Sequence, residues 1–310
     1  MRRCPVLGLI LALGVSPGLV AGVSGAGSGS GSGVIGEGAR AIWVSSFTWR
    51  SSDAEFGGIS GFSLGPDGLT FRAVEDTGIT FTGRLGRDAE GRVIGVAALP
   101  FVRLRGAGGQ PLGEEDWDAE AVAPGPGQSF FVAFERNDRI VRYPRDGAPP
   151  EVLTEGLDLS WVTYNKGFEA LAADGRGGLW AISEDPVSRR KGHPALSFDG
   201  TGWRLAFSIP AEGTWRVTDA DFGPDGRLYV LQRDFWGLVG FRSRVLRLSL
   251  AGSGLAGIET LFETQAGRHD NLEGLSVWAD AAGAIRLTMV SDDNFNILQR
   301  TEIVDYRVEE

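Results

Sequence analysis

Residues 168–187 read FEALAADGRGGLWAISEDPV: a short apolar stretch, a turn rich in glycine and aspartate, and a second apolar stretch that ends in charge. The same arrangement occurs in four other places in the 310-residue chain. The other copies are ISGFSLGPDGLTFRAVEDTG from Ile59, AEAVAPGPGQSFFVAFERND from Ala119, VTDADFGPDGRLYVLQRDFW from Val217 and LEGLSVWADAAGAIRLTMVSDDNF from Leu272. Successive copies begin roughly fifty residues apart, a period typical of solenoids and propellers.

Each copy has the pattern of two β-strands joined by a tight turn. Apolar and polar residues alternate in both stretches, so that Trp180, Ile182 and Glu184 fall on one face. The Gly-Pro-Asp-Gly sequences at 65–68 and 223–226 suit a turn, because proline presets φ and glycine accepts positive φ. Further strand-like runs follow each pair and bring the number to four per repeat, as in a propeller blade. The predicted fold class is therefore all-β, a single β-propeller.

The two ends of the chain are expected to share one blade. The last copy has room for only three strands, ending at 301–308, and the run Ala41–Trp49 is free to supply the fourth. Closure of this kind removes an exposed sheet edge. We count five blades; a sixth remains open if the long stretch between Gly78 and Asp116 contains a degenerate one.

The N-terminus has the features of an export signal. Met1-Arg2-Arg3 precedes an apolar run over 6–20, and small residues at 24–26 offer a cleavage site. The run is too short and too interrupted by glycine for a membrane span. We therefore expect a signal peptide over 1–26, a Gly/Ser linker over 27–37 and the propeller domain over 38–310, in a periplasmic or secreted protein. Cleavage removes Cys4, the only cysteine.

The charge balance bears on partners. Forty acidic residues against thirty basic ones give a net charge of −10. Such a surface disfavours nucleic acid, which requires a basic stripe, and is compatible with divalent cations. We expect a monomer that binds a small anionic or ester substrate. Histidines 193 and 269 lack metal or triad spacing, and the common serine-hydrolase, zinc-protease and nucleotide-binding motifs are absent.

The repeat also predicts where polar side chains gather. In a blade the innermost strand and its neighbour run antiparallel, so the start of the first lies beside the end of the second on one rim. At the starts of the inner strands the alignment places Ser60, Glu120, Glu169, Thr218 and Glu273. At the ends of the second strands it places Glu75, Glu135, Glu184, Arg233 and Asp292. The next position holds Asp76, Arg136, Asp185, Asp234 and Asp293.

Most of these rim residues are acidic, and like charges so crowded cannot all stay ionised without compensating cations. Carboxylate oxygens suit Ca²⁺ or Mg²⁺. A divalent cation, with Ca²⁺ as first choice, is thus the predicted cofactor. We expect three glutamates at the mouth of the channel and three acids in a second tier beside them. The predicted metal ligands, in that order, are Glu120, Glu169, Glu273, Glu135, Glu184 and Asp292.

Structural roles compete with these functional ones. An acid at a blade corner often only hydrogen-bonds the next loop, and for any single acid this is the more frequent role; the ring as a whole favours metal binding. Arg233 can contact an anion or form an internal salt bridge. Lys166, one of two lysines, can contact a substrate phosphate or pair with a neighbouring glutamate. Trp236 lies in a long loop, apart from the other tryptophans, which we expect in the core.

At these residues the chain resembles the phytase-like family, described as having esterase-like activity of phytase. The resemblance runs from about residue 40 to the C-terminus and is carried by 56–61, 165–171, 217–219 with 223–228, 270–274 with 291–295, and 298–301. It implies a β-propeller and a hydrolase of phosphoric or carboxylic esters. Better-known propeller phytases have six blades, calcium-bound acids and several lysines on substrate phosphates. This chain departs from them in having only two lysines.

Two hypotheses follow. In the first, the acids hold one or two divalent cations that polarise a phosphoryl oxygen and activate water. The candidate catalytic residues are then Glu169, Glu273, Lys166 and Arg233. The candidate substrate-binding residues are Ser60, Glu75, Asp76, Arg136, Asn165, Asp219 and Asn271. In the second hypothesis the propeller is a non-catalytic binding or scaffold protein with a structural cation.

Overall fold

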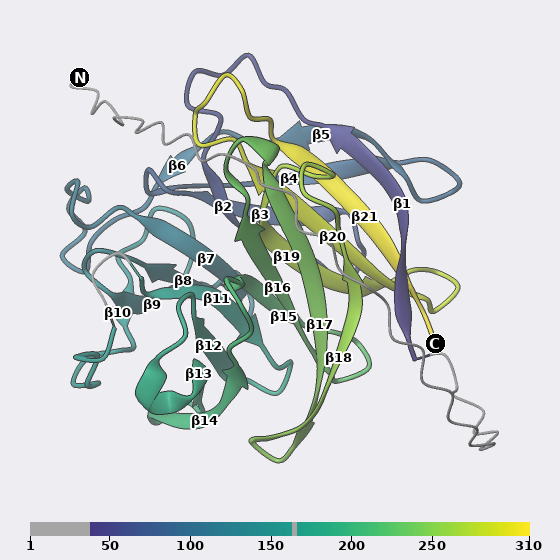
Figure 1. Cartoon of the computed structure of the whole chain (residues 1–310). Coiled ribbons are helices and arrows are strands. Elements are labelled where there is room, and N and C mark those ends of the chain that lie inside the picture. The colour runs from purple at the N-terminus through teal and green to yellow at the C-terminus, as the bar shows by residue number, and fades with distance from the viewer. Residues whose placement is uncertain (1–37, 163–165) are drawn as a thin grey trace, which may run out of the picture. The chain divides into compact units, whose positions relative to one another are not determined.

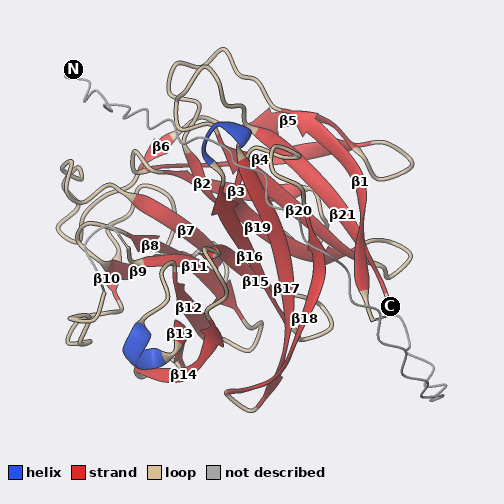
Figure 2. Cartoon of the chain, viewed as in Figure 1, coloured by secondary structure: helices blue, strands red, loops and turns tan. Residues whose placement is uncertain are grey.

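The computed structural model describes residues 38–162 and 166–310. Five antiparallel sheets form the blades of a β-propeller, and strands account for nearly all the regular structure (Figures 1 and 2). The predicted all-β propeller is confirmed. Single-turn 3₁₀ helices η1 (Ser188–Arg190) and η2 (Gly237–Val239) lie in loops. Within these ranges, no helix has the length and hydropathy needed to cross a membrane. The predicted signal peptide and linker lie outside the described residues.

In each of the first three blades, the strands follow the chain order from the innermost strand outward. The first contains β2 (Ile59–Leu64), β3 (Thr70–Glu75), β4 (Ile79–Arg87) and β5 (Val93–Ala98), with β6 (Val102–Arg103) also paired to β4. The second contains β7 (Ala119–Pro124), β8 (Phe130–Phe134), β9 (Arg139–Tyr143) and β10 (Glu151–Val152). The third contains β11 (Phe168–Ala173), β12 (Leu179–Ser183), β13 (Gly192–Phe198) and β14 (Trp203–Pro210).

The last two blades complete the ring. The fourth contains β15 (Arg216–Phe222), β16 (Leu228–Phe235), β17 (Phe241–Ala251) and β18 (Gly254–Glu263). The fifth contains β19 (Asn271–Ala279), β20 (Ile285–Asp292), β21 (Glu302–Glu309) and, outermost, β1 (Arg40–Thr48). Each inner strand contacts the inner strand of the next blade, and β19 returns to contact β2. Apolar side chains fill the space between successive blades, as in the buried cluster of Phe62, Phe71, Trp278 and Val290.

The predicted closure is confirmed. β1 pairs antiparallel with β21 from Arg40 opposite Glu309 to Thr48 opposite Glu302 (Figure 1). The two strands come from opposite ends of the described chain, so their pairing shields the edge that either would expose alone. The count of five blades is also confirmed, because the stretch between Gly78 and Asp116 supplies β4, β5 and β6 to the first blade.

A buried ion pair joins the first blade to the fifth blade, which contains the closing strand pair. Arg87 on β4 contacts Asp305 on β21, with Nη1 2.5 Å from Oδ2. The two side chains are 7% and 0% exposed. Thr288 Oγ1 donates a hydrogen bond of 2.6 Å to the other carboxylate oxygen. The pair thus adds a buried polar link between two blades that also pack through apolar side chains.

Removing one member of this pair should destabilise the propeller strongly. We expect Asp305→Ala to lower the free energy of unfolding by about 3–5 kcal/mol, because it leaves the Arg87 charge buried and unpaired. The matched control is Glu309→Ala on the same strand, whose carboxylate forms exposed pairs with Arg40 and Arg307. That change should leave the free energy of unfolding almost unchanged, because exposed ion pairs contribute little. Chemical denaturation of both variants checks the prediction, and equal losses would contradict it.

Candidate functional site

Every inner strand has a β-bulge near its start. The register with the second strand shifts between Ile59 and Gly61, and at the equivalent place in the other four blades. The bulged residues are Ser60, Glu120, Glu169, Thr218 and Glu273. These are the five residues that the repeat aligns at the strand starts. A bulge leaves the extra residue without a cross-strand partner and re-aims its side chain. The bulges therefore give these side chains a direction that regular alternation would not.

One cavity of about 230 Å³ collects most of the rim residues, and we call it the acid cavity. Its lining residues are all polar: Ser60, Asp76, Asp118, Glu120, Glu135, Arg136, Lys166, Glu169, Glu184, Arg233, Glu273, Asp292 and Asn294. Eight are acids and three are bases. The acids come from four of the five blades, and the fourth blade contributes Arg233 instead. The structure thus brings together eleven of the residues that the repeat or the resemblance singled out.

Two groups of acids in this cavity have metal-ligand geometry. One oxygen from each of Asp118, Glu120 and Glu135 lies within 4.8 Å of the others. The same holds for Glu135, Glu169 and Glu184. Glu135 belongs to both groups, so it lies at the centre of the acids rather than in a second tier. Hard carboxylate oxygens at this spacing are the donor set that Ca²⁺ and Mg²⁺ prefer.

The acids that line the cavity differ in the hydrogen bonds that their carboxylates already accept. Glu135 Oε1 accepts a hydrogen bond of 2.6 Å from the backbone N–H of Gly167. Glu120 and Glu169 accept no hydrogen bond from any residue that the structure describes. Asp76 has a buried oxygen, Oδ1, without a hydrogen-bond partner within the same ranges. A buried carboxylate oxygen without a partner is costly, so Asp76 Oδ1 fits a role as a cation ligand.

The cavity's basic residues are paired. Lys166 Nζ lies 2.6 Å from Glu184 Oε2, and the pKa of Lys166 is raised because this pairing outweighs the effect of burial. Arg233 forms an ion pair with Glu273, donates a hydrogen bond of 2.8 Å to Asn271, and lies 3.7 Å from Glu184. For both Lys166 and Arg233 the sequence left open an anion contact or an internal salt bridge, and the structure contains the internal salt bridge in each case. Arg136, in a left-handed conformation at φ 60°, pairs with Asp118 at 2.7 Å.

Burial and mutual repulsion make this cavity costly to ionise. Burial, and then Glu169 among the neighbouring acids, raises the pKa of Glu120 well above its usual value. Burial likewise raises the pKa of Glu169, although Arg233 opposes the shift. Burial and Glu273 raise the pKa of Asp292 to about 9. For Glu135, burial raises the pKa to about 7 against the opposing hydrogen bond from Gly167. Without a bound cation, several of these groups hold protons near neutral pH.

Three predicted substrate contacts do not line the acid cavity. Glu75 is fully buried outside the cavity. Asp219 is also buried and bridges two blades, accepting hydrogen bonds from the backbone N–H groups of Ala220 and Leu275. Because both carboxylates are buried, neither can contact a substrate. Asn271 does not line the acid cavity either; it donates a hydrogen bond of 2.8 Å to Glu273, which makes it a positioning residue. Asn165 lies outside the described residues.

Two cavity residues were not predicted. Asp118 is the residue directly before β7, two positions ahead of Glu120, and lines the same cavity. Because Glu120 is the bulged residue, strand alternation does not relate the two side chains. Asn294 follows the second strand of the fifth blade at φ 48°, and donates its backbone N–H to Asp292 Oδ1 at 2.7 Å. It falls within the 291–295 segment that carried the family resemblance.

A loop contact explains two of the resembling segments. Gly58 donates its N–H to Asp293 Oδ1 at 3.1 Å, and the Phe295 ring lies against both Gly57 and Gly58. A Cβ on Gly58 would lie 2.5 Å from the Phe295 ring, and its φ of 59° also favours glycine. The pair of glycines in the first blade is therefore required by the loop of the fifth. This contact holds Asp292 and Asn294 at the cavity.

The part of the chain that matches a known family includes every residue that lines the acid cavity. A family model described as "Phytase-like: Esterase-like activity of phytase" matches residues 54–295. No curated protein sequence matches the chain.

Solved structures resemble the chain at low identity. The PQQ-bound aldose sugar dehydrogenase from Streptomyces coelicolor is 15% identical, with a TM-score of 0.45 over 86% of this chain and 98% of that one. Virginiamycin B lyase from Staphylococcus aureus is 11% identical, with a TM-score of 0.41 over 82% of this chain and 71% of that one. A nidogen/laminin complex gives 12% identity and a TM-score of 0.43 over 76% and 75%. No argument about function rests on these likenesses.

Proposed function

Since the chain belongs to the phytase-like family, we propose that it is a divalent-cation-dependent hydrolase of phosphoric esters that acts at the acid cavity. The observation that carries the proposal is the presence of two clusters of three acids, with Glu135 in both. Within each cluster, one carboxylate oxygen of every acid lies within 4.8 Å of the others. They lie in the same cavity as Arg136, Lys166 and Arg233. Acids that could hold a cation and bases that could contact an anion thus share one cavity, which supports the proposal of metal-assisted phosphoryl transfer.

The chain's own residues would divide the work. Glu120, Glu169 and Glu135 would hold the cation, with Asp118 and Glu184 completing the two groups. A bound divalent cation supplies Lewis-acid polarisation of a phosphoryl oxygen and lowers the pKa of bound water. We propose Ca²⁺, because the acids are many and differently oriented, which suits its flexible coordination better than the strict octahedron of Mg²⁺.

The bases and the remaining acids would handle charge and protons. Arg136 and Lys166 line the cavity and are partly exposed to it, so each can exchange its internal partner for a phosphate oxygen. Arg233 is less exposed and would hold Glu273 in place. Asp292 lines the same cavity and would be placed to exchange a proton with a leaving oxygen.

A second candidate function is favoured by the ion pairs already formed. Because Lys166 and Arg233 are paired with Glu184 and Glu273, the cavity is partly neutralised without any anion. A non-catalytic binding or scaffold propeller with one structural cation would need no more. We further propose that the protein is exported and acts as a monomer in the periplasm or outside the cell, on the basis of its leader sequence.

Cation dependence is the prediction that tests both candidates. Adding Ca²⁺ at about one hundred times its Kd should stabilise the metal-free protein by about 2.7 kcal/mol through mass action. Thermal melts with Ca²⁺, Mg²⁺, Na⁺ at matched ionic strength, or EDTA measure this shift, and total metal analysis of the purified protein accompanies them. Hydrolysis of phenyl phosphate, bis(4-nitrophenyl) phosphate and 4-nitrophenyl acetate is assayed in parallel.

The outcomes separate the candidates. A Ca²⁺-dependent Tm together with phosphate-ester hydrolysis that EDTA abolishes would support the enzyme. A Ca²⁺-dependent Tm with no hydrolysis of any ester would support the scaffold. An unchanged Tm would contradict both, and would leave the acids as hydrogen-bonding groups of the blade corners.

A further inference from the structure

A second cavity opens beside the acid cavity and has different chemistry. Its volume is about 390 Å³, and it shares Glu184, Arg233 and Asn294 with the acid cavity. Its other walls include Thr214, Phe235 and Phe241, which gives this side of the mouth an aromatic surface. We call it the side pocket. Because the two cavities share lining residues, a molecule bound in one can extend into the other.

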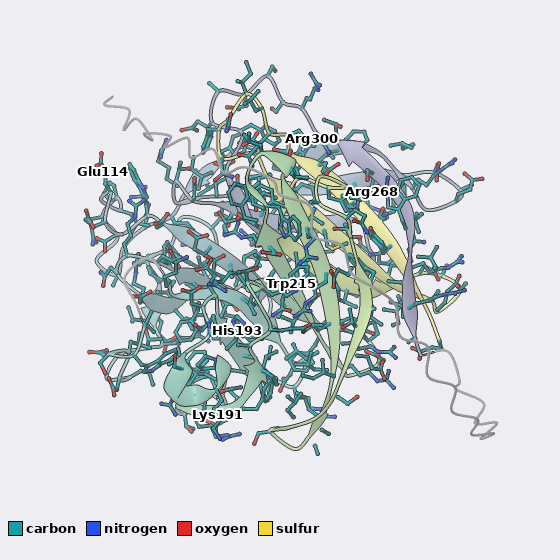
Figure 3. The ribbon with its side chains drawn as sticks, in the orientation of Figure 1. Glu114, Lys191, His193, Trp215, Arg268 and Arg300 are labelled. Carbon is teal, nitrogen blue, oxygen red and sulfur yellow. The ribbon has the colours of Figure 1, made fainter. Side chains whose placement is uncertain are left out.

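The aromatic wall of the side pocket is held rigidly by one buried acid. Asp234 accepts hydrogen bonds from Thr214 Oγ1 at 2.6 Å, Trp236 Nε1 at 2.6 Å and Arg242 Nη2 at 2.8 Å. The Arg242 guanidinium lies 4.8 Å from the ring centres of both Trp236 and Trp215. Trp215, labelled in Figure 3, comes from the segment before β15. This arrangement fixes the turn that follows β16, which is a feature of a formed site.

The wall is also exposed, although it is apolar. Phe235 is 64% exposed, and its ring lies 4.9 Å from that of Phe241, which pairs with it across β16 and β17. Trp236, the next residue in the chain, is 53% exposed. Across the pocket, Asn294 begins the loop that contains the exposed Phe295. Aromatic side chains fixed in place and open to solvent are more typical of a binding surface than of a core.

The side pocket is poorly suited to a second phosphate. Its two lining arginines, Arg233 and Arg216, form ion pairs with Glu273 and Asp185, and two lining acids match them in number, so the walls carry no excess positive charge. Glu184 and Asp234 add negative charge to the walls. A substrate with many phosphates would place an uncompensated anion against these acids. A substrate with one phosphate and a flat apolar group would instead place the phosphate in the acid cavity and the apolar group against Phe235.

We propose that the side pocket binds the organic group of an aryl phosphate monoester, or of an ester with a similarly flat apolar group. This inference rests on the proposed function, since it assigns the phosphate to the acid cavity. In the reaction, water adds to phosphorus while the bond from phosphorus to the aryl oxygen breaks. That oxygen takes a proton, and the products are inorganic phosphate and a phenol.

The test compares methyl, phenyl and 1-naphthyl phosphate on the Ca²⁺-loaded protein. Phe235→Ala should raise the KM for 1-naphthyl phosphate about fivefold, since an aromatic contact is worth about 1 kcal/mol and about 1.4 kcal/mol corresponds to a factor of ten. The KM for methyl phosphate should change less than about twofold. Phe235→Tyr should restore the wild-type preference. Trp43→Ala, which removes an exposed aromatic ring on β1, is the matched control and should alter neither value.

A binding measurement keeps this inference separate from the proposed function. Calorimetry with 1-naphthylmethylphosphonate, which has no bond to hydrolyse, should show weaker binding to Phe235→Ala than to wild type. If that difference appears without hydrolysis of any ester, the side pocket stands and the proposed enzyme falls. If all three esters are hydrolysed with the same KM in wild type and Phe235→Ala, the enzyme stands and the side pocket falls. Absence of phosphonate binding to wild type also overturns the side pocket.

Discussion

Glu169→Gln is expected to lower kcat/KM for phosphate esters by about 10²–10⁴-fold, the range for loss of an essential acid–base or ligand group. It should also abolish most of the increase in Tm that Ca²⁺ produces. Glu169 is 7% exposed, lies at the bulge of β11 and belongs to one of the two carboxylate groups. The amide keeps the size of the side chain but supplies only a neutral oxygen. Steady-state kinetics and melts with Ca²⁺ or EDTA measure both effects.

The same change should stabilise the metal-free protein. Burial raises the pKa of Glu169 well above its usual value, so ionising this carboxylate near neutral pH costs stability. Glutamine resembles the protonated acid and avoids that cost. In EDTA the Tm of Glu169→Gln should therefore exceed the wild-type value, whereas with saturating Ca²⁺ the order should reverse. Such a crossing is not expected of a residue whose role is only to maintain packing.

The control is the same substitution at an exposed glutamate. Glu151 on β10 pairs with Arg142 on the surface, and Glu151→Gln should leave activity, Tm and the Ca²⁺ effect unchanged. Glu135→Gln should weaken the Ca²⁺ effect as much as Glu169→Gln, because Glu135 belongs to both carboxylate groups. From the aligned strands alone a weaker effect was expected. A full Ca²⁺ effect in both variants would contradict the proposed cation site.

The fold and the position of the candidate site were accessible from the sequence because a repeat carries spatial information. Equivalent residues of radially arranged blades lie on a circle, so alignment alone places Glu120, Glu169 and Glu273 near one another. The closure of the ring by Ala41–Trp49 followed from counting strands. Both arguments depend on the number and order of strands and not on the details of any side chain.

The details that were missed depend on local backbone geometry. An alternating pattern does not reveal a β-bulge, so the direction of Glu169 and the central place of Glu135 were not predictable from spacing. Asp219 was selected through resemblance, but its segment matters for a different reason: the carboxylate joins the inner strands of two blades. The pairing of Arg233 with Glu273 rather than with an anion depends on distances between blades, which the sequence does not contain.

The metal-free protein should lose stability as the pH rises. Burial raises the pKa of Asp292 to about 9, that of Glu75 to about 8, and that of Asp76 to about 7. In the unfolded chain these acids ionise near pH 4. Between about pH 4 and the raised values the folded state therefore holds more protons than the unfolded state. Stability is greatest at the acidic end of that window and falls until the folded groups have ionised.

The measurement is best confined to about pH 7–9. The pKa of His269 is lowered to about 4 by burial, and that of His193 is also lowered by burial, so both histidines favour folding as the pH rises toward their unfolded pKa near 6.5. Above about pH 7 the histidines are largely neutral in the unfolded chain as well, so their contribution to stability no longer changes with pH. The three acids together hold on average roughly one and a half extra protons over these two pH units, which corresponds to a loss on the order of 4 kcal/mol, since one unit is worth about 1.4 kcal/mol per proton.

Denaturant titrations in EDTA at successive pH values should therefore give a falling free energy of unfolding, and saturating Ca²⁺ should flatten the slope. A cation can replace the protons only by displacing them, so Ca²⁺ binding should release protons and tighten as the pH rises. Glu151→Gln should retain the wild-type slope, and a double variant with Glu120→Gln and Glu169→Gln should reduce it. A slope that is level or rising in EDTA would mean that the cavity acids are ionised without a cation, and the electrostatic basis for the cation site would be lost.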